Sequence, residues 1–187
     1  MIITWIIATT FSSYTLATSQ RLPPHPSEAT WILIDTKVQT LEVFRGDVSI
    51  KKFKRVAIGS KGAALNRRRG DNKTPIGRYQ ITSLNANSKF HFFIGLDYPS
   101  RLQLNQALRN KIISSAEYRR IMDKRRLTGV TPQDTILGGY IGIHGLGSAN
   151  RAIHAAYNWT QGCIALTNSE IDQLRKYVQL NMLVVII

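Results

Sequence analysis

Short β-prone runs separated by turn residues dominate this chain. The first two runs are 31–35 and 40–44, and the turn Arg45-Gly46-Asp47 then leads into a third run at 48–50. β-branched and aromatic residues favour strands, and a glycine beside an aspartate favours the turn that joins two of them. Further runs lie at 53–58, 78–82, 91–96, 140–143 and 182–187. The pattern predicts a mainly antiparallel β domain and argues against a doubly wound parallel sheet, in which strands and helices alternate regularly.

Two segments carry helix-start signals. Ser114 and Thr167 each stand three residues before a glutamate, which is the spacing of a capping box. After the second signal, Ile171, Leu174 and Val178 share one face of a helix. We therefore expect a mainly β domain with helical insertions.

Length and composition agree with one globular domain. The chain has 187 residues, of which 43% are hydrophobic and 19% are charged. These proportions are close to the average of folded proteins, so extensive disorder is not expected. The sequence contains no run of eighteen apolar residues and no fixed repeat, which argues against a polytopic membrane protein and a solenoid.

The chain is strongly basic, with 25 lysines and arginines against 11 acidic residues and a net charge of +14. The positive residues gather at 51–73 and 119–126. They form either an ordinary solvated face or a surface that binds a polyanion, such as an anionic cell-wall polymer. A nucleic-acid module would add interleaved aromatic residues or a recognition helix. Neither is present, so we expect no nucleic-acid partner.

The first twenty residues predict export. Residues 1–17 are apolar and rich in hydroxyl side chains, and Thr15-Leu16-Ala17 resembles a cleavage site. We interpret 1–20 as a signal peptide, 21–30 as a proline-rich linker and 31–187 as the domain. No basic residue precedes the apolar run, so an uncleaved anchor or a buried N-terminal strand is the alternative. The expected location is the periplasm or cell envelope.

The chemistry of the chain is concentrated around its single cysteine. His144 ends one β-prone run, and Gly162-Cys163 opens another. An imidazole on a neighbouring strand can activate a thiol as a thiolate, and bare backbone N–H groups at Gly162 and Cys163 can stabilise an oxyanion. The alternatives are an inert buried cysteine with a core histidine, or a zinc site formed by His144, His154 and Cys163.

Several segments occur in an order that resembles one known family. They are WILID at 31–35 with LEVF at 41–44, GDNKTPIGRY at 70–79, DYP at 97–99, His144 followed by Thr160-Gln161-Gly162-Cys163, and the final stretch 168–187. Together they resemble the L,D-transpeptidase catalytic domain of the YkuD type, over Trp31 to Ile187. The resemblance implies a mixed β-sandwich.

The resemblance also implies roles for individual residues. Cys163 matches the nucleophile and His144 its base, while the carbonyl of Gly145 matches the group that orients the imidazole. The backbone N–H groups of Gln161, Gly162 and Cys163 match the oxyanion hole. No metal ion and no organic cofactor is implied.

Two positions depart from the family pattern. Gln161 stands where a histidine is common, and Ala165 stands where an arginine that meets a substrate carboxylate is often found. Arg151 could supply the missing charge or be an ordinary surface residue. The other candidate substrate-binding residues are Tyr140, Trp159 and Thr160.

The implied reaction is attack on the bond between meso-diaminopimelate and D-Ala in a peptidoglycan tetrapeptide stem. D-Ala leaves, a Cys163 thioester forms, and an amine resolves it as a 3→3 cross-link or as an attachment to an envelope lipoprotein. The alternatives are a peptide hydrolase on the same scaffold and a non-catalytic wall-binding module. We expect peptidoglycan stem peptides as partners, and a monomer.

Overall fold

The structure is a computed structural model, and it describes residues 29–187. The predicted signal peptide and positions 21–28 of the predicted linker lie outside the described residues, so both stay predictions. The first strand begins at Thr30, next to the predicted start of the domain. Within residues 29–187, no helix combines the length and the apolar character that a membrane crossing requires.

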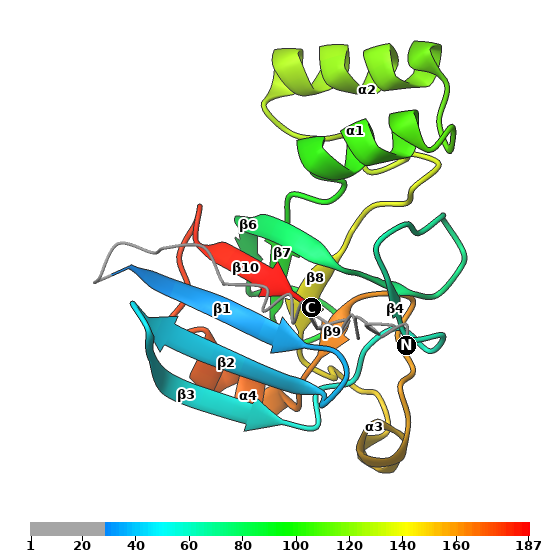
Figure 1. Ribbon diagram of the computed structural model, residues 1–187. Coiled ribbons are helices and arrows are strands. Elements are labelled where there is room, and N and C mark those ends of the chain that lie inside the picture. Colours follow the sequence, from blue (N-terminus) through cyan, green and yellow to red (C-terminus); the bar gives the residue numbers. More distant parts are fainter. Residues whose placement is uncertain (1–28) are drawn as a thin grey trace, which may run out of the picture.

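An eight-stranded sheet organises the domain (Figure 1). Its spatial order is β3-β2-β1-β10-β6-β7-β8-β9. The strands are β1 (Thr30–Asp35), β2 (Thr40–Arg45), β3 (Val48–Lys54), β6 (Gly77–Asn85), β7 (Phe93–Leu96), β8 (Gly142–His144), β9 (Ile164–Ala165) and β10 (Leu183–Ile186). Two short strands, β4 (Ala63–Ala64) and β5 (Thr74–Pro75), pair separately. The expectation of a mainly β domain is confirmed.

The sheet is mainly antiparallel, as the strand pattern predicted, with five antiparallel pairs among its seven strand pairings. β1 pairs with β10 in parallel, and so does β8 with β9. A parallel pair needs a long crossover connection, and the chain between β8 and β9 supplies one that contains the helix α3 (Arg151–Ala156). These two parallel pairs give the sheet the mixed character that the family resemblance implied.

One continuous core joins the two halves of the sheet. Ile32 of β1, Ile143 of β8 and Ile164 of β9 all belong to it and are fully buried. Helix α4 (Asn168–Leu174) contributes Ile171 and Leu174 to the same core. Its N-cap Thr167 forms the predicted capping box with the glutamate at 170. The helix ends at Leu174, so the expectation that Val178 continues it is wrong.

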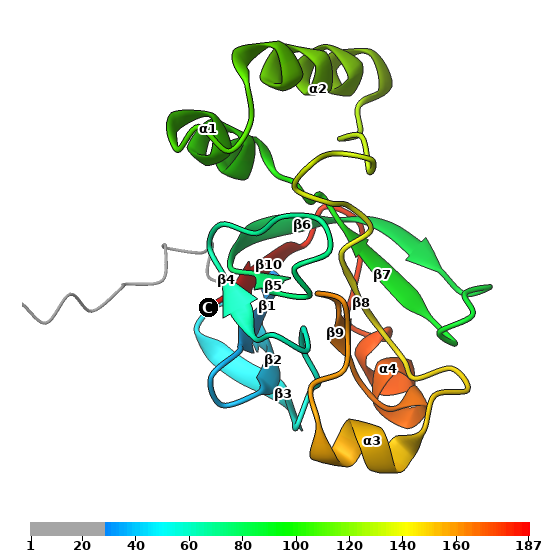
Figure 2. The same ribbon diagram turned by 90° about the vertical axis from the view of Figure 1, so that its right-hand side faces the viewer.

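A helical hairpin stands away from the sheet between β7 and β8 (Figures 1 and 2). It consists of α1 (Arg101–Arg109) and α2 (Ser115–Thr128). Ser114 caps α2 as predicted. Helix α1 was not predicted from the sequence, although Ser100 and Gln103 form a capping box at its start.

Candidate active site

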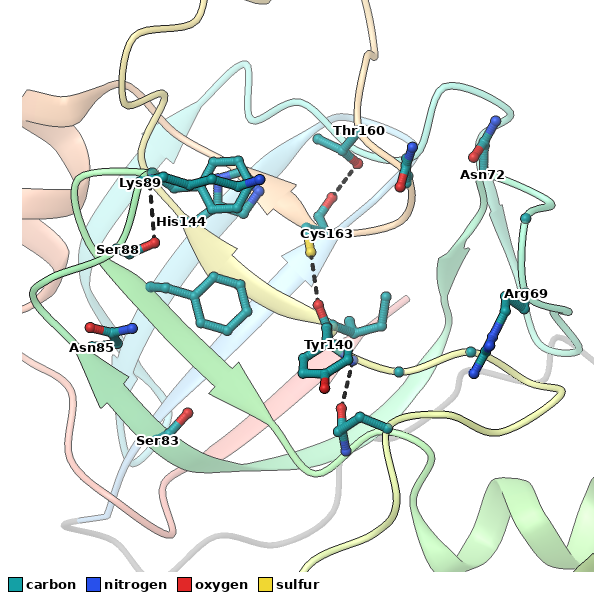
Figure 3. Close-up of a pocket in the computed structure, with 18 of the residues that line it drawn as sticks. Arg69, Asn72, Ser83, Asn85, Ser88, Lys89, Tyr140, His144, Thr160 and Cys163 are labelled. Atoms are coloured by element: carbon teal, nitrogen blue, oxygen red, sulfur yellow. Dashed lines mark hydrogen bonds between the residues drawn. The ribbon is translucent and has the colours of Figure 1, made fainter.

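The parallel pairing of β8 and β9 brings His144 and Cys163 together. Ile143 is the register partner of Ile164, and both side chains are buried in the core. Side chains alternate between the faces of a strand, so His144, one residue after Ile143, and Cys163, one residue before Ile164, project to the opposite face. Figure 3 shows both side chains in the same cleft.

The imidazole of His144 is held in one tautomer. Its Nδ1 is 2.6 Å from the carbonyl oxygen of Gly145, which can only accept a hydrogen bond. Nδ1 therefore carries the proton, and Nε2 is left as the basic nitrogen. A Cβ on Gly145 would lie 2.8 Å from Asn168 Oδ1 and from the carbonyl of Phe90, so only glycine fits there.

Asn168 fixes the loop that carries this carbonyl. Its Oδ1 accepts from the N–H of Gly147 at 2.9 Å, and its Nδ2 donates to the carbonyl of Gly147 at 2.9 Å. Because Asn168 is the first residue of α4, the capped helix anchors the loop next to His144. Nothing in the sequence analysis pointed to this side chain, whose contact partner is distant along the chain.

Aromatic rings enclose the imidazole. Phe90 stacks on His144 with ring centroids 4.3 Å apart, and Phe93, its register partner across β7 and β8, lies at 6.1 Å. Trp159 approaches edge-on at 6.1 Å. His144 is only 2% exposed, and this burial lowers its pKa below the ordinary value, with the hydrogen bond to Gly145 acting the other way. The imidazole is therefore neutral at pH 7.

The thiol of Cys163 is protonated in this structure. Its Sγ donates to the carbonyl of Tyr140 at 3.3 Å. Burial raises the pKa of Cys163 to about 11, although a backbone hydrogen bond from Gly142 and the charge of Arg67 act in the opposite direction. The sequence left two possibilities open, a thiol activated as a thiolate by an imidazole and an inert buried cysteine. The structure favours the protonated thiol because the surroundings desolvate the sulfur, and this penalises the charged form.

Thr160 shapes the backbone beside the sulfur. Its hydroxyl donates to the carbonyl of Cys163 at 2.6 Å and accepts from the N–H of Gly162 at 3.1 Å. Of the three expected oxyanion donors, the Gly162 N–H is thus already engaged. Gln161 and Cys163 remain the candidates for that role.

Both side chains open into a cleft of about 1380 Å³ (Figure 3). Its lining contains six of the candidate site residues named from the sequence: Tyr140, His144, Trp159, Thr160, Gln161 and Cys163. The remaining wall comes from strands β6 and β7 and from loops far apart in the sequence, and many of its side chains are polar. Among those lining residues are Asn72, Ser83, Asn85, Ser88 and Lys89.

Arg151 and His154 lie away from this lining. Arg151 is exposed at the start of α3, and it is not among the residues that line the cleft. His154 is buried, and its Nδ1 accepts from Trp159 Nε1 at 3.4 Å, which positions a ring of the cleft wall. Within residues 29–187, no three His, Cys, Asp or Glu side chains form a cluster that could hold a metal ion, so His144, His154 and Cys163 do not form the zinc site considered above.

A family model agrees with the geometry. The model of the L,D-transpeptidase catalytic domain, YkuD, matches residues 29–186. The chain belongs to this family. No curated protein matches it.

Solved structures share the fold of this L,D-transpeptidase domain. The helical cell shape determining protein Pgp2 from Campylobacter jejuni is 21% identical with a TM-score of 0.55, over 84% of this chain and 47% of that one. Bd1075 from Bdellovibrio bacteriovorus is 19% identical with a TM-score of 0.53, over 86% of this chain and 48% of that one. An L,D-transpeptidase from Stackebrandtia nassauensis is 12% identical with a TM-score of 0.50, over 92% and 61%. The chain spans about half the length of the first two.

One cleft residue of this L,D-transpeptidase domain was missed by the sequence analysis. Arg67 lines the same cleft as Cys163 but is 5% exposed. In the sequence it is one of many positive residues in a basic stretch, so nothing distinguished it from its exposed neighbours.

Proposed function

We propose that the protein is an exported cysteine L,D-transpeptidase acting on peptidoglycan tetrapeptide stems. The observation that supports this best is the placement of Cys163 and a tautomerically fixed His144 in one cleft. The family supplies the reaction class, and the geometry is compatible with Cys163 as the nucleophile and His144 as its base.

Catalysis begins with a proton transfer. The thiol turns from the carbonyl of Tyr140 toward Nε2 of His144, which takes its proton as general base. The sulfur then attacks the carbonyl carbon of the diaminopimelate–D-Ala bond, and the N–H groups of Gln161 and Cys163 stabilise the oxyanion. The carbonyl of Gly145 holds the imidazolium that has formed, because it accepts from Nδ1 in both protonation states.

The intermediate then collapses. The C–N bond breaks as the carbon–sulfur thioester remains, and His144 returns the proton to the nitrogen of the departing D-Ala. An amine of a second stem or of an envelope lipoprotein attacks the thioester, loses its proton to His144, and restores the Cys163 thiol. Water in place of the amine would give hydrolysis.

The proposed location is the periplasm or cell envelope, where such stems are found. Pgp2 is a cell shape determining protein, and we propose a related role in wall shaping for this chain.

The test uses protein starting near residue 21, purified tetrapeptide muropeptides and mass spectrometry, beside Cys163→Ala. We expect release of D-Ala and a 3→3 dimer with the unaltered chain, and neither product with the variant. Release without dimer would point to the hydrolase. No release, together with a thiol that reagents do not modify, would point to the wall-binding module. Full activity of Cys163→Ala would overturn the mechanism.

A further inference from the structure

Arg67 is a buried cation whose hydrogen bonds are unsatisfied. Its side chain is 5% exposed, and the donors Nε and Nη1 have no hydrogen-bond partner among the described residues. Buried guanidinium groups are ordinarily paired, because each unsatisfied donor loses its bonds to water without compensation. An arginine in this condition is suited to an anion that is not part of the chain.

The neighbours of Arg67 compensate its charge only in part. Asp71 Oδ1 lies 3.6 Å from Nε, but this oxygen already accepts from the N–H of Lys73 at 3.0 Å. The other carboxylate oxygen of Asp71 accepts from the N–H of Arg68 at 2.9 Å. The guanidinium also lies over the ring of Tyr98, 5.5 Å from its centroid. These contacts hold the group in place and leave its donors unused.

The unused donors lie beside the reactive sulfur. A Cβ on Gly162, the residue before Cys163, would be 2.5 Å from Nη1, so the guanidinium packs directly against this stretch of backbone. On the other side, a Cβ on Gly138 would be 3.2 Å from Nη2. Two glycines therefore let the main chain approach the cation closely, and Arg67 itself forms part of the cleft lining.

The charge of the cleft favours an anionic ligand. Arg67, Arg69 and Lys89 line it, against the single carboxylate of Asp134. Arg69 is exposed. Lys89 lies near His144, on the opposite side of the view in Figure 3 from Arg69. Arg67 alone combines burial with proximity to Gly162 and Cys163.

We propose that Arg67 binds a carboxylate of the substrate next to the bond that Cys163 attacks, which makes it a residue that positions and selects the donor stem. This inference rests on the proposed function. A planar guanidinium with free Nε–H and Nη–H donors matches a carboxylate with two hydrogen bonds. Arg67, on the loop before β5, would thus supply the positive charge that an arginine often supplies at the position of Ala165.

Two carboxylates of a tetrapeptide stem can reach such a site. One is the C-terminal carboxylate of the departing D-Ala, and the other is the free carboxylate of diaminopimelate. Either carboxylate would form the same pair of hydrogen bonds with the guanidinium. Amidating one carboxylate at a time shows which of the two binds.

The experiment measures binding without turnover. Cys163→Ala protein is titrated by NMR with the tetrapeptide, with its C-terminal amide and with its diaminopimelate amide. We expect one of the two amides to bind about tenfold or more weakly than the free acid, as is typical of a lost charge-assisted hydrogen bond. Adding Arg67→Met should weaken binding of the free acid to the level of that amide and leave binding of the amide unchanged. Arg68→Met, an exposed neighbour outside the cleft lining, is the matched control and should change neither.

A purely structural role is separated by thermal unfolding. Because Arg67 Nε and Nη1 make no hydrogen bond and the ion pair with Asp71 is long at 3.6 Å, Arg67→Met should change the Tm little, whereas loss of a structural arginine would lower it clearly. In the active background we expect Arg67→Lys to restore part of kcat/KM by retaining the charge.

Two results overturn the proposal: both amides bind as tightly as the acid, or Arg67→Met keeps the preference for the acid. The first needs no variant of Arg67, so it holds even if Arg67→Met does not fold. A third result is possible: the acid binds preferentially and this preference depends on Arg67, but the unaltered chain releases no D-Ala. It would contradict the proposed function and still support the anion site at Arg67.

Discussion

Cys163 Sγ donates its proton to the backbone carbonyl of Tyr140 at 3.3 Å, so the thiol rests against an acceptor that cannot remove the proton. Tyr140 has a positive φ of 54°, an unusual conformation for a residue with a side chain. Its N–H donates to Gln133 Oε1 at 2.5 Å, which holds the peptide in this geometry. This geometry and the burial of the sulfur both favour the protonated thiol.

The first prediction concerns the reactivity of this thiol. Because burial raises the pKa of Cys163 to about 11, the thiolate fraction of the free enzyme should increase about tenfold per pH unit between pH 7 and pH 10. Alkylation by iodoacetamide, followed by intact mass, should increase in parallel. Cys163→Ala removes the only cysteine and gives the blank. A rate that is already at its plateau at pH 7 would contradict the prediction.

The second prediction concerns the acidic side of the activity profile. The base must be neutral, and burial holds the pKa of His144 below its ordinary value. Protonation therefore occurs at a lower pH than for an exposed histidine, and the acidic decrease in kcat/KM for donor cleavage should have its midpoint below the ordinary histidine pKa. Phe90→Ala opens the stack on the imidazole and should move this decrease to higher pH. An unchanged profile in Phe90→Ala would show that the ring does not control the pKa.

The motif that carries the chemistry was predictable from the sequence, because its residues lie in one continuous stretch. The runs at 31–35 and 40–44 became β1 and β2 for the same local reason. The run at 53–58 was misread as one strand. Arg55 has a φ of 61°, which ends β3, and Ala57 then pairs with Ala165 beside the site.

What the sequence did not reveal depends on contacts between distant segments. Asn168 and Arg67 act through groups far along the chain, and their residue types occur often elsewhere on the surface. The raised pKa of Cys163 was not predictable for the same reason, because desolvation depends on the walls of the cleft. These walls combine residues of β6 and β7 with loops from distant parts of the chain, which no local pattern brings together.

The third prediction tests the anchor of the imidazole. Asn168→Ala removes both hydrogen bonds to Gly147 and so frees the loop that carries the Gly145 carbonyl. We expect kcat for D-Ala release to decrease about tenfold or more with little change in KM, because the base loses its orientation while the cleft wall remains. Asn168→Asp keeps only the accepting oxygen, and its kcat should lie between those of the unaltered chain and of Asn168→Ala. A change confined to KM would argue against this positioning role.

The fourth prediction concerns the hydroxyl of Thr160. Thr160→Val keeps the shape of the side chain but breaks the bonds to the Cys163 carbonyl and from the Gly162 N–H. Two buried polar groups then lose their partner, and we expect unfolding to become easier by about 1–3 kcal/mol together with a loss of activity. Thr160→Ser retains the hydroxyl and is the matched control. Denaturant unfolding and D-Ala release measure the two effects, and equal behaviour of Val and Ser would exclude a role for the hydroxyl.

The last prediction concerns the basic hairpin that stands away from the sheet. Arg119 and Lys124 are exposed on α2, where their charges face solvent. Arg119→Gln with Lys124→Gln should weaken retention on purified cell walls at low salt and flatten its salt dependence, since fewer charges contribute to the attraction. The control replaces the ion pair formed by Glu117 and Arg120 with two glutamines, which leaves the net charge unchanged and should leave retention unchanged. Retention that does not weaken at high ionic strength in the unaltered chain would exclude an electrostatic role for this surface.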